Sequence, residues 1–124
     1  MTSHIIETSG LNRLLGIRST GSGSSARHFV KVEAGMKMSE LIAITHGNGL
    51  TLRSPTLFPW PSIAGAVSTG SHGVGKSGGC FSDSITELQI VDATGAVRTV
   101  SEGDAEMPAA KVALGSLGMI YSIE

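Results

Sequence analysis

The sequence predicts an α+β domain, and three observations support this prediction. Residues with the two-residue alternation of strands occur at 28–35, 86–92, 96–101 and 118–123. Apolar side chains at helical spacing occur at 38–45. The strands at 86–92 and 96–101 flank Thr94-Gly95, which is typical of a β-hairpin. Strand pairs with interspersed helices favour the α+β class.

Composition excludes several classes of protein. The 124 residues suffice for one domain, and with 40% hydrophobic and 15% charged residues the chain is globular rather than disordered. A formal net charge of −1 leaves no basic footprint for nucleic acid. Cys80 is the only cysteine, which excludes an internal disulfide and a multi-cysteine metal site. Residues 1–10 lack a signal-peptide pattern and no apolar run could span a membrane, so we expect a cytoplasmic protein.

The first third of the chain predicts two strands, with about one helical turn and a polar loop between them. Residues 3–8 indicate a short strand, and the leucines within residues 11–17 indicate about one helical turn. Residues 18–27 are polar, rich in glycine and aperiodic, which predicts a loop. Residues 28–35 alternate as a strand does.

The middle of the chain predicts a helix and then an irregular connector. The residues that recur at helical spacing are Met38, Leu41, Ile42 and Thr45. Gly47 and Gly49 end this helix. Three prolines within residues 50–62 forbid regular structure there, and we expect Trp60 to be a packed anchor. Further on, residues 104–114 predict a helix that has Pro108 in its first turn and ends at Gly115.

The segment GSHGVGKS at 70–77 fits the phosphate-loop pattern of nucleotide triphosphatases. A phosphate loop needs a buried strand before it and a helix that begins at its lysine, here Lys76. Gly78 and Gly79 follow, and each glycine costs a helix roughly 1 kcal/mol. The best strand for holding Mg²⁺, residues 88–92, runs directly into the hairpin turn. We therefore keep the triphosphatase only as an alternative.

A wider window, SIAGAVSTGSHGVG at 62–75, favours another ligand. Its glycines and small residues predict a loop whose main chain is exposed along one side, and successive amides of such a loop can bind an anion. The hydroxyls that add donors are those of Ser62, Ser68, Thr69 and Ser71. We expect this loop to bind a diphosphate without a lysine or a helix.

The same segment closely resembles the flavin-binding loop of the vanillyl-alcohol oxidase (PCMH-type) flavoproteins. The similarity is greatest to the branch that contains alditol oxidase, L-gulonolactone oxidase and the aldonolactone oxidases. Other motifs follow in the family's order: LNRLLGI at 11–17, VEAGMKMSELI at 32–42, DATGAVRTVS at 92–101 and ALGSLGMI at 113–120. The resemblance therefore covers nearly the whole chain.

The resemblance implies a PCMH-type FAD-binding domain, with a largely antiparallel or mixed sheet flanked by helices. Residues 1–27 would be the end of a first subdomain and a connector, and 28–124 would be the main, second subdomain. The residues that would bind FAD are Ser62, Ile63, Gly65, Ala66, Val67, Ser68, Thr69, Gly70, His72, Gly73, Gly75 and Ile120. Among these, Ile120 would offer its backbone to the adenine end, and His72 would brace the loop rather than act as a catalyst.

The activity that the resemblance implies belongs to a longer parent protein. That parent would be an FAD-dependent oxidoreductase that removes hydride from a CH–OH carbon of a polyol or sugar lactone. Flavin N5 would accept the hydride, and dioxygen or another acceptor would reoxidise the flavin. We assign no catalytic residue, because the cap domain that orients the substrate is absent from this chain. A non-catalytic remnant is a further alternative.

Overall fold

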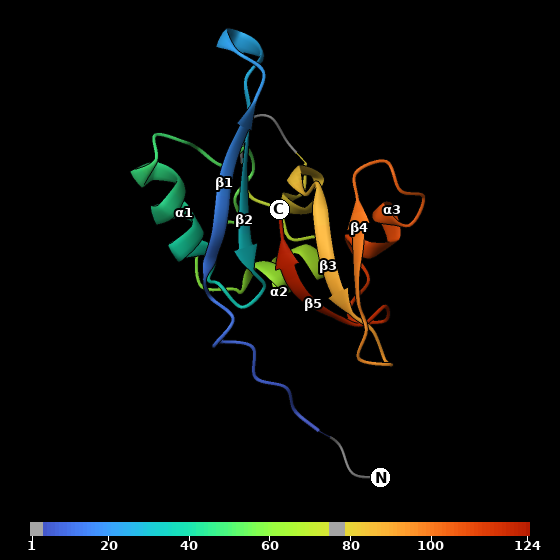
Figure 1. The fold of residues 1–124 in the computed structure, drawn as a ribbon. Coiled ribbons are helices and arrows are strands. Elements are labelled where there is room, and N and C mark those ends of the chain that lie inside the picture. The colour runs from blue at the N-terminus through green and yellow to red at the C-terminus, as the bar shows by residue number, and fades with distance from the viewer. Residues whose placement is uncertain (1–3, 75–78) are drawn as a thin grey trace.

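A computed structural model describes residues 4–74 and 79–124 (Figure 1). Its strands are β1 (Leu14–Thr20), β2 (Arg27–Glu33), β3 (Glu87–Val91), β4 (Val97–Ser101) and β5 (Met119–Ile123). Its α-helices are α1 (Met38–Gly47), α2 (Ile63–Ser68) and α3 (Met107–Ala110). Two short 3₁₀ helices, Gly23–Ser25 and Phe81–Ser84, complete the described elements. None of these helices has the length and apolar character that crossing a membrane requires.

The strands form one sheet in the order β1-β2-β5-β3-β4, and every pair in it is antiparallel. The last strand, β5, thus lies in the middle of the sheet between β2 and β3 (Figure 1). It pairs with β3 over most of its length but with β2 only at Ser122 and Ile123. The expected α+β class with an antiparallel sheet is confirmed.

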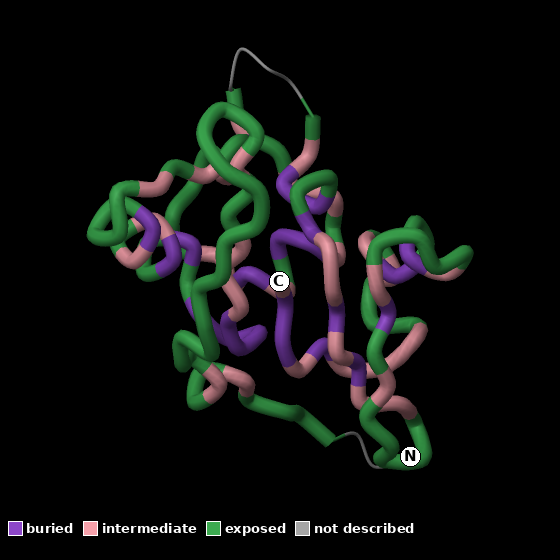
Figure 2. Tube along the Cα trace, turned by 45° about the horizontal axis from the view of Figure 1, so that its top comes forward, coloured by how far each residue is buried: buried purple, intermediate pink, exposed green. Residues whose placement is uncertain are grey.

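The core lies between the central strands and the helices α1 and α2 (Figure 2). Val32 of β2, Ile123 of β5 and Leu88 of β3 lie side by side across the sheet, and all are at most 2% exposed. Ile63 and Val67 of α2 are fully buried against them. Because burying an aliphatic side chain of this size contributes about 1.5–3 kcal/mol, this packing holds α2 against the sheet.

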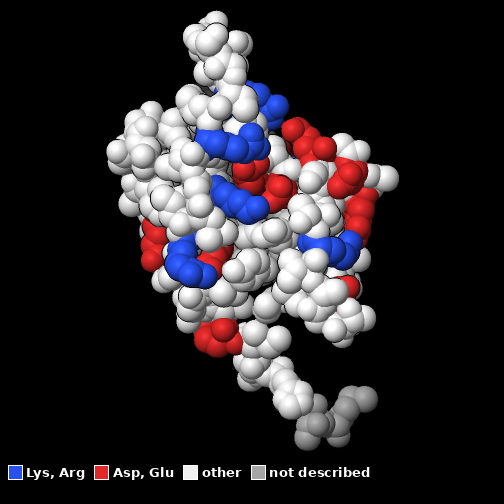
Figure 3. Space-filling view, viewed as in Figure 1, with Lys and Arg blue, Asp and Glu red and all other residues white. Residues whose placement is uncertain are grey.

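The opposite face of the sheet is polar. Lys31 of β2 pairs with Glu87 of β3, and Arg18 of β1 pairs with Glu124 just after β5. Figure 3 shows Lys and Arg next to Asp and Glu across this face.

Several expectations about the elements are confirmed. β2 and α1 lie where the alternation and the helical spacing place them, and residues 50–61 form neither helix nor strand. The expected hairpin is formed by β3 and β4, with Val91 opposite Val97 next to the turn. The strand at the end of the chain is β5.

The expectations for the N-terminal segment are wrong. Residues 4–8 form no strand, and residues 14–17 belong to strand β1 rather than to a helix. Their pairing with β2 overrides the local helical pattern, because a single turn of helix is unstable without tertiary support. The loop expected at 18–27 is also shorter, since Arg18–Thr20 extend β1 and pair with Arg27–Phe29.

Two further expectations are corrected by packing. The segment expected to be a loop at 62–75 contains the helix α2, because its buried residues pack into the core despite a glycine within it. The helix expected at 104–114 is limited to α3, and Leu114 (φ 52°) and Gly115 (φ 82°) have left-handed backbones. Trp60 is 65% exposed and stacks on Phe58 at 5.1 Å between ring centroids, so it is not a packed anchor.

Candidate functional site

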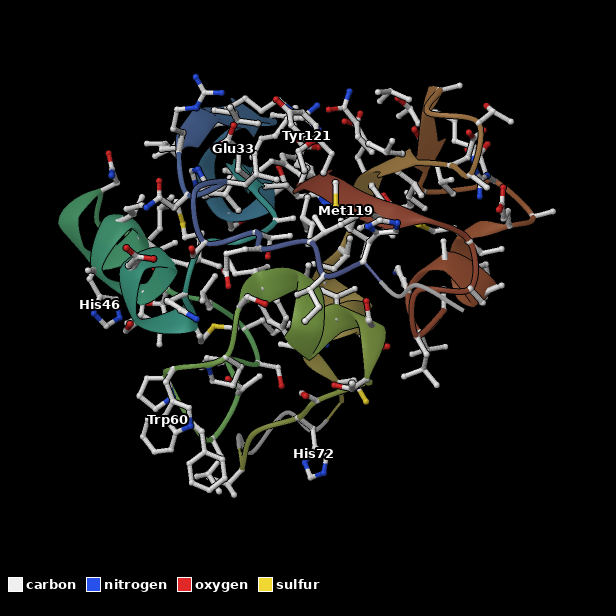
Figure 4. All side chains as sticks on the ribbon, turned by 90° about the horizontal axis from the view of Figure 1, so that it is seen from below. Glu33, His46, Trp60, His72, Met119 and Tyr121 are labelled. Atoms are coloured by element: carbon white, nitrogen blue, oxygen red, sulfur yellow. The ribbon has the colours of Figure 1, made fainter. Side chains whose placement is uncertain are left out.

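The segment 62–74 lies on one side of the central strand β5. Figure 4 shows α2 between β5, which carries Met119 and Tyr121, and the loop that carries His72. α2 contacts both β5 and the 3₁₀ helix at Phe81–Ser84. The loop after α2 is tied back to that 3₁₀ helix, because the amide of Phe81 donates to the carbonyl of Ser71 at 2.9 Å.

The first amides of α2 bind within the protein. The amide of Ile63 donates to the carbonyl of Met36 at 2.8 Å, and that of Ala64 donates to the carbonyl of Ala34 at 3.0 Å. The amide of Gly65 donates to Ser62 Oγ at 3.3 Å, which makes Ser62 the N-cap. The N-terminus of α2 therefore differs from that of the helix in a phosphate loop, whose first amides face the ligand.

Burial divides the predicted site residues into two sets. Ile63, Ala66 and Val67 are at most 1% exposed, so their side chains hold α2 in the core. The outward set begins with Gly65, Thr69 and His72, which are exposed. The other predicted site residues that the structure describes in this segment are half-buried, namely Ser62, Ser68, Gly70 and Gly73. Gly75 lies outside the described residues.

Glycine occupies three described positions of this segment for three different physical reasons. A Cβ built on Gly65 would meet only Ser62 Oγ, at 3.1 Å, so this residue leaves the outward side of α2 bare. Gly70 has φ +61°, a conformation that favours glycine. A Cβ on Gly73 would lie 2.2 Å from the carbonyl oxygen of Pro55, so Gly73 is required for packing. Of these three glycines, Gly65 is the one that is exposed and has no backbone atom in the way of an added Cβ.

Small polar groups surround the bare surface at Gly65. Thr69 Oγ1 donates to the carbonyl of Gly65 at 2.9 Å and lies 2.9 Å from Ser71 Oγ. His72 Nδ1 lies 3.2 Å from the carbonyl oxygen of its neighbour Gly73, and His72 forms an isolated β-bridge with Cys80. Thr69 and His72 are exposed and Ser71 is half-buried, so two hydroxyls and an imidazole follow Gly65 along the chain.

Ile120 lies in β5, next to α2. Its side chain is 8% exposed and belongs to the core, so only its backbone can face a ligand. β5 pairs with β3 on one side at Ile120, but on the other side β2 pairs only with Ser122 and Ile123. Among the described residues, the second edge of Met119 and Ile120 therefore has no strand partner.

The described residues do not form the frame of a phosphate loop. Gly75, Lys76 and Ser77 lie outside them. The element before Gly70 is the helix α2 rather than a strand, and all strand pairs among residues 4–74 and 79–124 are antiparallel. Beyond the gap, the first element is the four-residue 3₁₀ helix at Phe81–Ser84. A phosphate loop instead joins a buried strand to an α-helix.

Residues 2–101 match the family model described as "FAD binding domain". The chain belongs to this family. Its relatives include alditol oxidase from a Streptomyces species, 32% identical over 76% of this chain and 23% of that protein. A putative D-arabinono-1,4-lactone oxidase from Neurospora crassa is 40% identical over 76% of this chain and 17% of that protein. An L-gulono-1,4-lactone dehydrogenase from Mycobacterium tuberculosis is 35% identical over 96% of this chain and 26% of that protein.

The expected resemblance to the alditol and aldonolactone oxidase branch is thus confirmed, and the chain spans about a quarter or less of these relatives' length. Among solved structures, cholesterol oxidase from B. sterolicum matches 94% of this chain and 23% of its own, with a TM-score of 0.74 and 24% identity. This likeness concerns the fold. Together with the family match, it confirms the PCMH-type FAD-binding fold.

FAD is the cofactor of this domain family, and the geometry of the site fits it. Ser62 Oγ is the only atom that a Cβ on Gly65 would meet, and the hydroxyl of Thr69, itself beside that of Ser71, bonds to the carbonyl of Gly65. A large, extended dinucleotide needs such a bare surface because it must approach the main chain of the protein closely. Sequence reasoning missed the support for this surface: Ala34 and Met36 accept the first amides of α2, although both lie in a motif that marks the family.

Proposed function

We propose that this chain is the FAD-binding part of an FAD-dependent oxidoreductase that oxidises a CH–OH group of a polyol or sugar lactone. The observation that carries this proposal is the bare outward side of α2 at Gly65 in a chain whose residues 2–101 match the FAD binding domain family. The names of its relatives, alditol oxidase and the aldonolactone oxidases and dehydrogenase, support the substrate class.

The proposed FAD contacts follow the two sets of residues. The outward residues of the segment would bind the dinucleotide along the strip that begins at Gly65 and ends beyond His72. The inward residues of α2 would position this strip through the core, and the open edge of β5 at Ile120 would meet the adenine end. When bound, FAD supplies the hydride acceptor at its N5 atom. The role of these residues is to bind and orient the cofactor.

The substrate and the electron acceptor depend on parts of the protein that we place outside this chain. We assign no base or substrate clamp to the described residues, and we propose that a cap domain carries them. Relatives are named both oxidases and a dehydrogenase, so dioxygen and other acceptors are both candidates. The choice between them belongs to the full-length protein.

A flavin-binding measurement tests the proposal directly. Full-length protein, stripped of cofactor, is titrated with FAD and, in parallel, with ATP, while flavin fluorescence and protein fluorescence are followed. We expect saturable binding of FAD, no binding of ATP, and the same FAD affinity after Lys76→Ala. Binding of ATP that Lys76→Ala abolishes would establish the triphosphatase instead. No response to either nucleotide would favour a non-catalytic remnant.

A second measurement addresses the substrate. The flavin-loaded protein is mixed anaerobically with alditols and with aldonolactones, and bleaching of the flavin absorption is recorded. We expect bleaching by at least one member of these two classes. Recovery of the absorption on admitting air then separates an oxidase from a dehydrogenase. Failure of every alditol and aldonolactone would contradict the substrate class and leave the flavin site standing.

A further inference from the structure

Glu33, at the end of β2, is a fully buried carboxylate whose role is not explained by the fold alone. Its side chain is 0% exposed, whereas the side chain of its partner Arg13 is 71% exposed. Arg13 donates three hydrogen bonds to it: from Nη2 to Oε1 at 2.7 Å, from Nε to Oε1 at 3.0 Å and from its backbone amide to Oε2 at 2.9 Å. These bonds keep the pKa of Glu33 below its usual range, so the buried group stays charged.

The pair joins the N-terminal segment to the turn that follows β2. The amide of Glu33 donates to the carbonyl of Arg13 at 3.0 Å, next to the side-chain bonds. Two residues further on, a Cβ on Gly35 would lie 1.8 Å from the carbonyl oxygen of Thr8. The backbone of the N-terminal segment therefore lies directly on the turn 33–36, and any larger residue at Gly35 would push the two apart.

The same turn also forms hydrogen bonds to the start of helix α2. The carbonyl oxygens of Ala34 and Met36 accept the amides of Ala64 and Ile63 at the start of α2. The amide of Ala34 also donates to the carbonyl of Tyr121 in β5 at 2.9 Å. Figure 4 shows Glu33 and Tyr121 close together on the side of β5 opposite to His72. The turn 33–36 thus bonds at once to the N-terminal segment, to β5 and to α2.

We propose that Glu33 and Arg13 are positioning residues of the flavin site, which set the place of α2 through the turn 33–36. The inference rests on FAD binding at the outward side of α2, as stated in the proposed function. A buried carboxylate with three donors fixes the end of β2 because its displacement would leave a charge unpaired. The carbonyls of Ala34 and Met36, and with them Gly65, then keep their positions.

The experiment compares Glu33→Gln with Glu106→Gln in the full-length protein. Glu106 pairs with Arg98 beside β4 and shares no bond with α2, so its variant is a matched control for the loss of an ion pair. For each variant we measure the dissociation constant of FAD, the visible circular dichroism of the saturated flavin and the thermal midpoint of the apoprotein. We expect Glu33→Gln to bind FAD about tenfold more weakly and to change the dichroism of the bound flavin, because a shift of the turn 33–36 would move α2.

A double-mutant cycle sharpens the test. Arg13→Met removes both guanidinium bonds and leaves the buried carboxylate with only the backbone amide of residue 13, so it should weaken FAD binding more than Glu33→Gln does. The double variant should bind FAD better than Arg13→Met alone, because no unpaired charge remains. Arg13→Lys keeps the charge but loses the two-nitrogen contact, and should weaken FAD binding by about threefold.

Two results would overturn the positioning role. One is a Glu33→Gln variant with a lowered thermal midpoint but with the FAD affinity and flavin dichroism of the wild type, which would mark a purely structural pair. If Glu33→Gln does not fold, unchanged FAD affinity in Arg13→Lys overturns the role in the same way. A wild-type protein that binds no FAD would contradict the proposed function as well, and this outcome is visible before any variant is made.

Discussion

The carbonyl oxygen of Met36 accepts a hydrogen bond of 2.8 Å from the amide of Ile63, and this bond joins the turn after β2 to the first residue of α2. Ile63 is fully buried, so the bond and the packing act on the same residue. A six-residue helix has little stability of its own. The start of α2 is therefore decided by its contacts with the turn after β2 and with the core.

The bare surface at Gly65 leads to the first prediction. Gly65→Ala should leave the free energy of unfolding of the apoprotein unchanged or raise it by up to about 1 kcal/mol, because alanine favours a helix and only Ser62 Oγ must move. FAD affinity should fall, and should fall further in Gly65→Leu, because the side chain would stand where we propose that the cofactor binds. Urea unfolding and FAD titration measure the two effects. Gly47→Ala in α1 is the control, since a Cβ there meets nothing within 4 Å. Undiminished FAD affinity in Gly65→Leu would remove this surface from the site.

For Gly73 we predict a loss of stability on substitution, in contrast to Gly65. Its added Cβ would lie 2.2 Å from the carbonyl of Pro55, which is backbone and has little room to move. Gly73→Ala should therefore destabilise the protein by about 1–3 kcal/mol, the usual range for overpacking. Gly16→Ala in β1, where a Cβ meets nothing within 4 Å, is the matched control in urea unfolding. Equal stability of the two variants would show that the loop and the Pro55 segment do not pack in this way.

Substitutions of Ser62 distinguish its role as the N-cap of α2 from a role in cofactor binding. Its Oγ accepts the amide of Gly65, so Ser62→Ala should cost about 1 kcal/mol of stability. Ser62→Asp keeps a capping oxygen and adds a negative charge near the helix start, which should preserve stability. The same charge should weaken binding of the FAD diphosphate by repulsion, and more so at low ionic strength. FAD affinity that is equal in Ser62→Asp and the wild type would place the diphosphate elsewhere.

The pKa of Glu33 predicts a pH dependence of stability. Hydrogen bonds from Arg13 lower this pKa in the folded state, so the folded protein binds fewer protons there than the unfolded chain does. The resulting stability is fully present above the pKa of the unfolded chain and is lost as the pH falls through the lowered folded pKa. We expect the difference in unfolding free energy between the wild type and Glu33→Gln to shrink on acidification, as followed by urea unfolding at a series of pH values. A difference that stays constant from neutral to acidic pH would show that the Glu33 charge contributes no stability.

Local sequence patterns predicted a large part of this fold. The alternation around Val30 and Val32 places β2, and Thr94-Gly95 places the hairpin, because both signals arise within a few residues. The window 62–75 also led to the family and to FAD, since the order of small residues and glycines there is specific. Residues 14–17 were misassigned because their leucine spacing fits one helical turn, whereas strand β1 depends on pairing with β2, a partner outside this stretch.

The sequence alone therefore specifies the fold class, most of the paired strands and the cofactor. Only the tertiary structure shows that residues 63–68 form a helix, that Gly65 rather than Gly73 faces outward, and that Glu33 binds Arg13. These features depend on partners far away in the chain, such as Met36 for Ile63 and Pro55 for Gly73. A periodic pattern reports which face of an element is apolar, but the element that it meets is decided when the whole core packs.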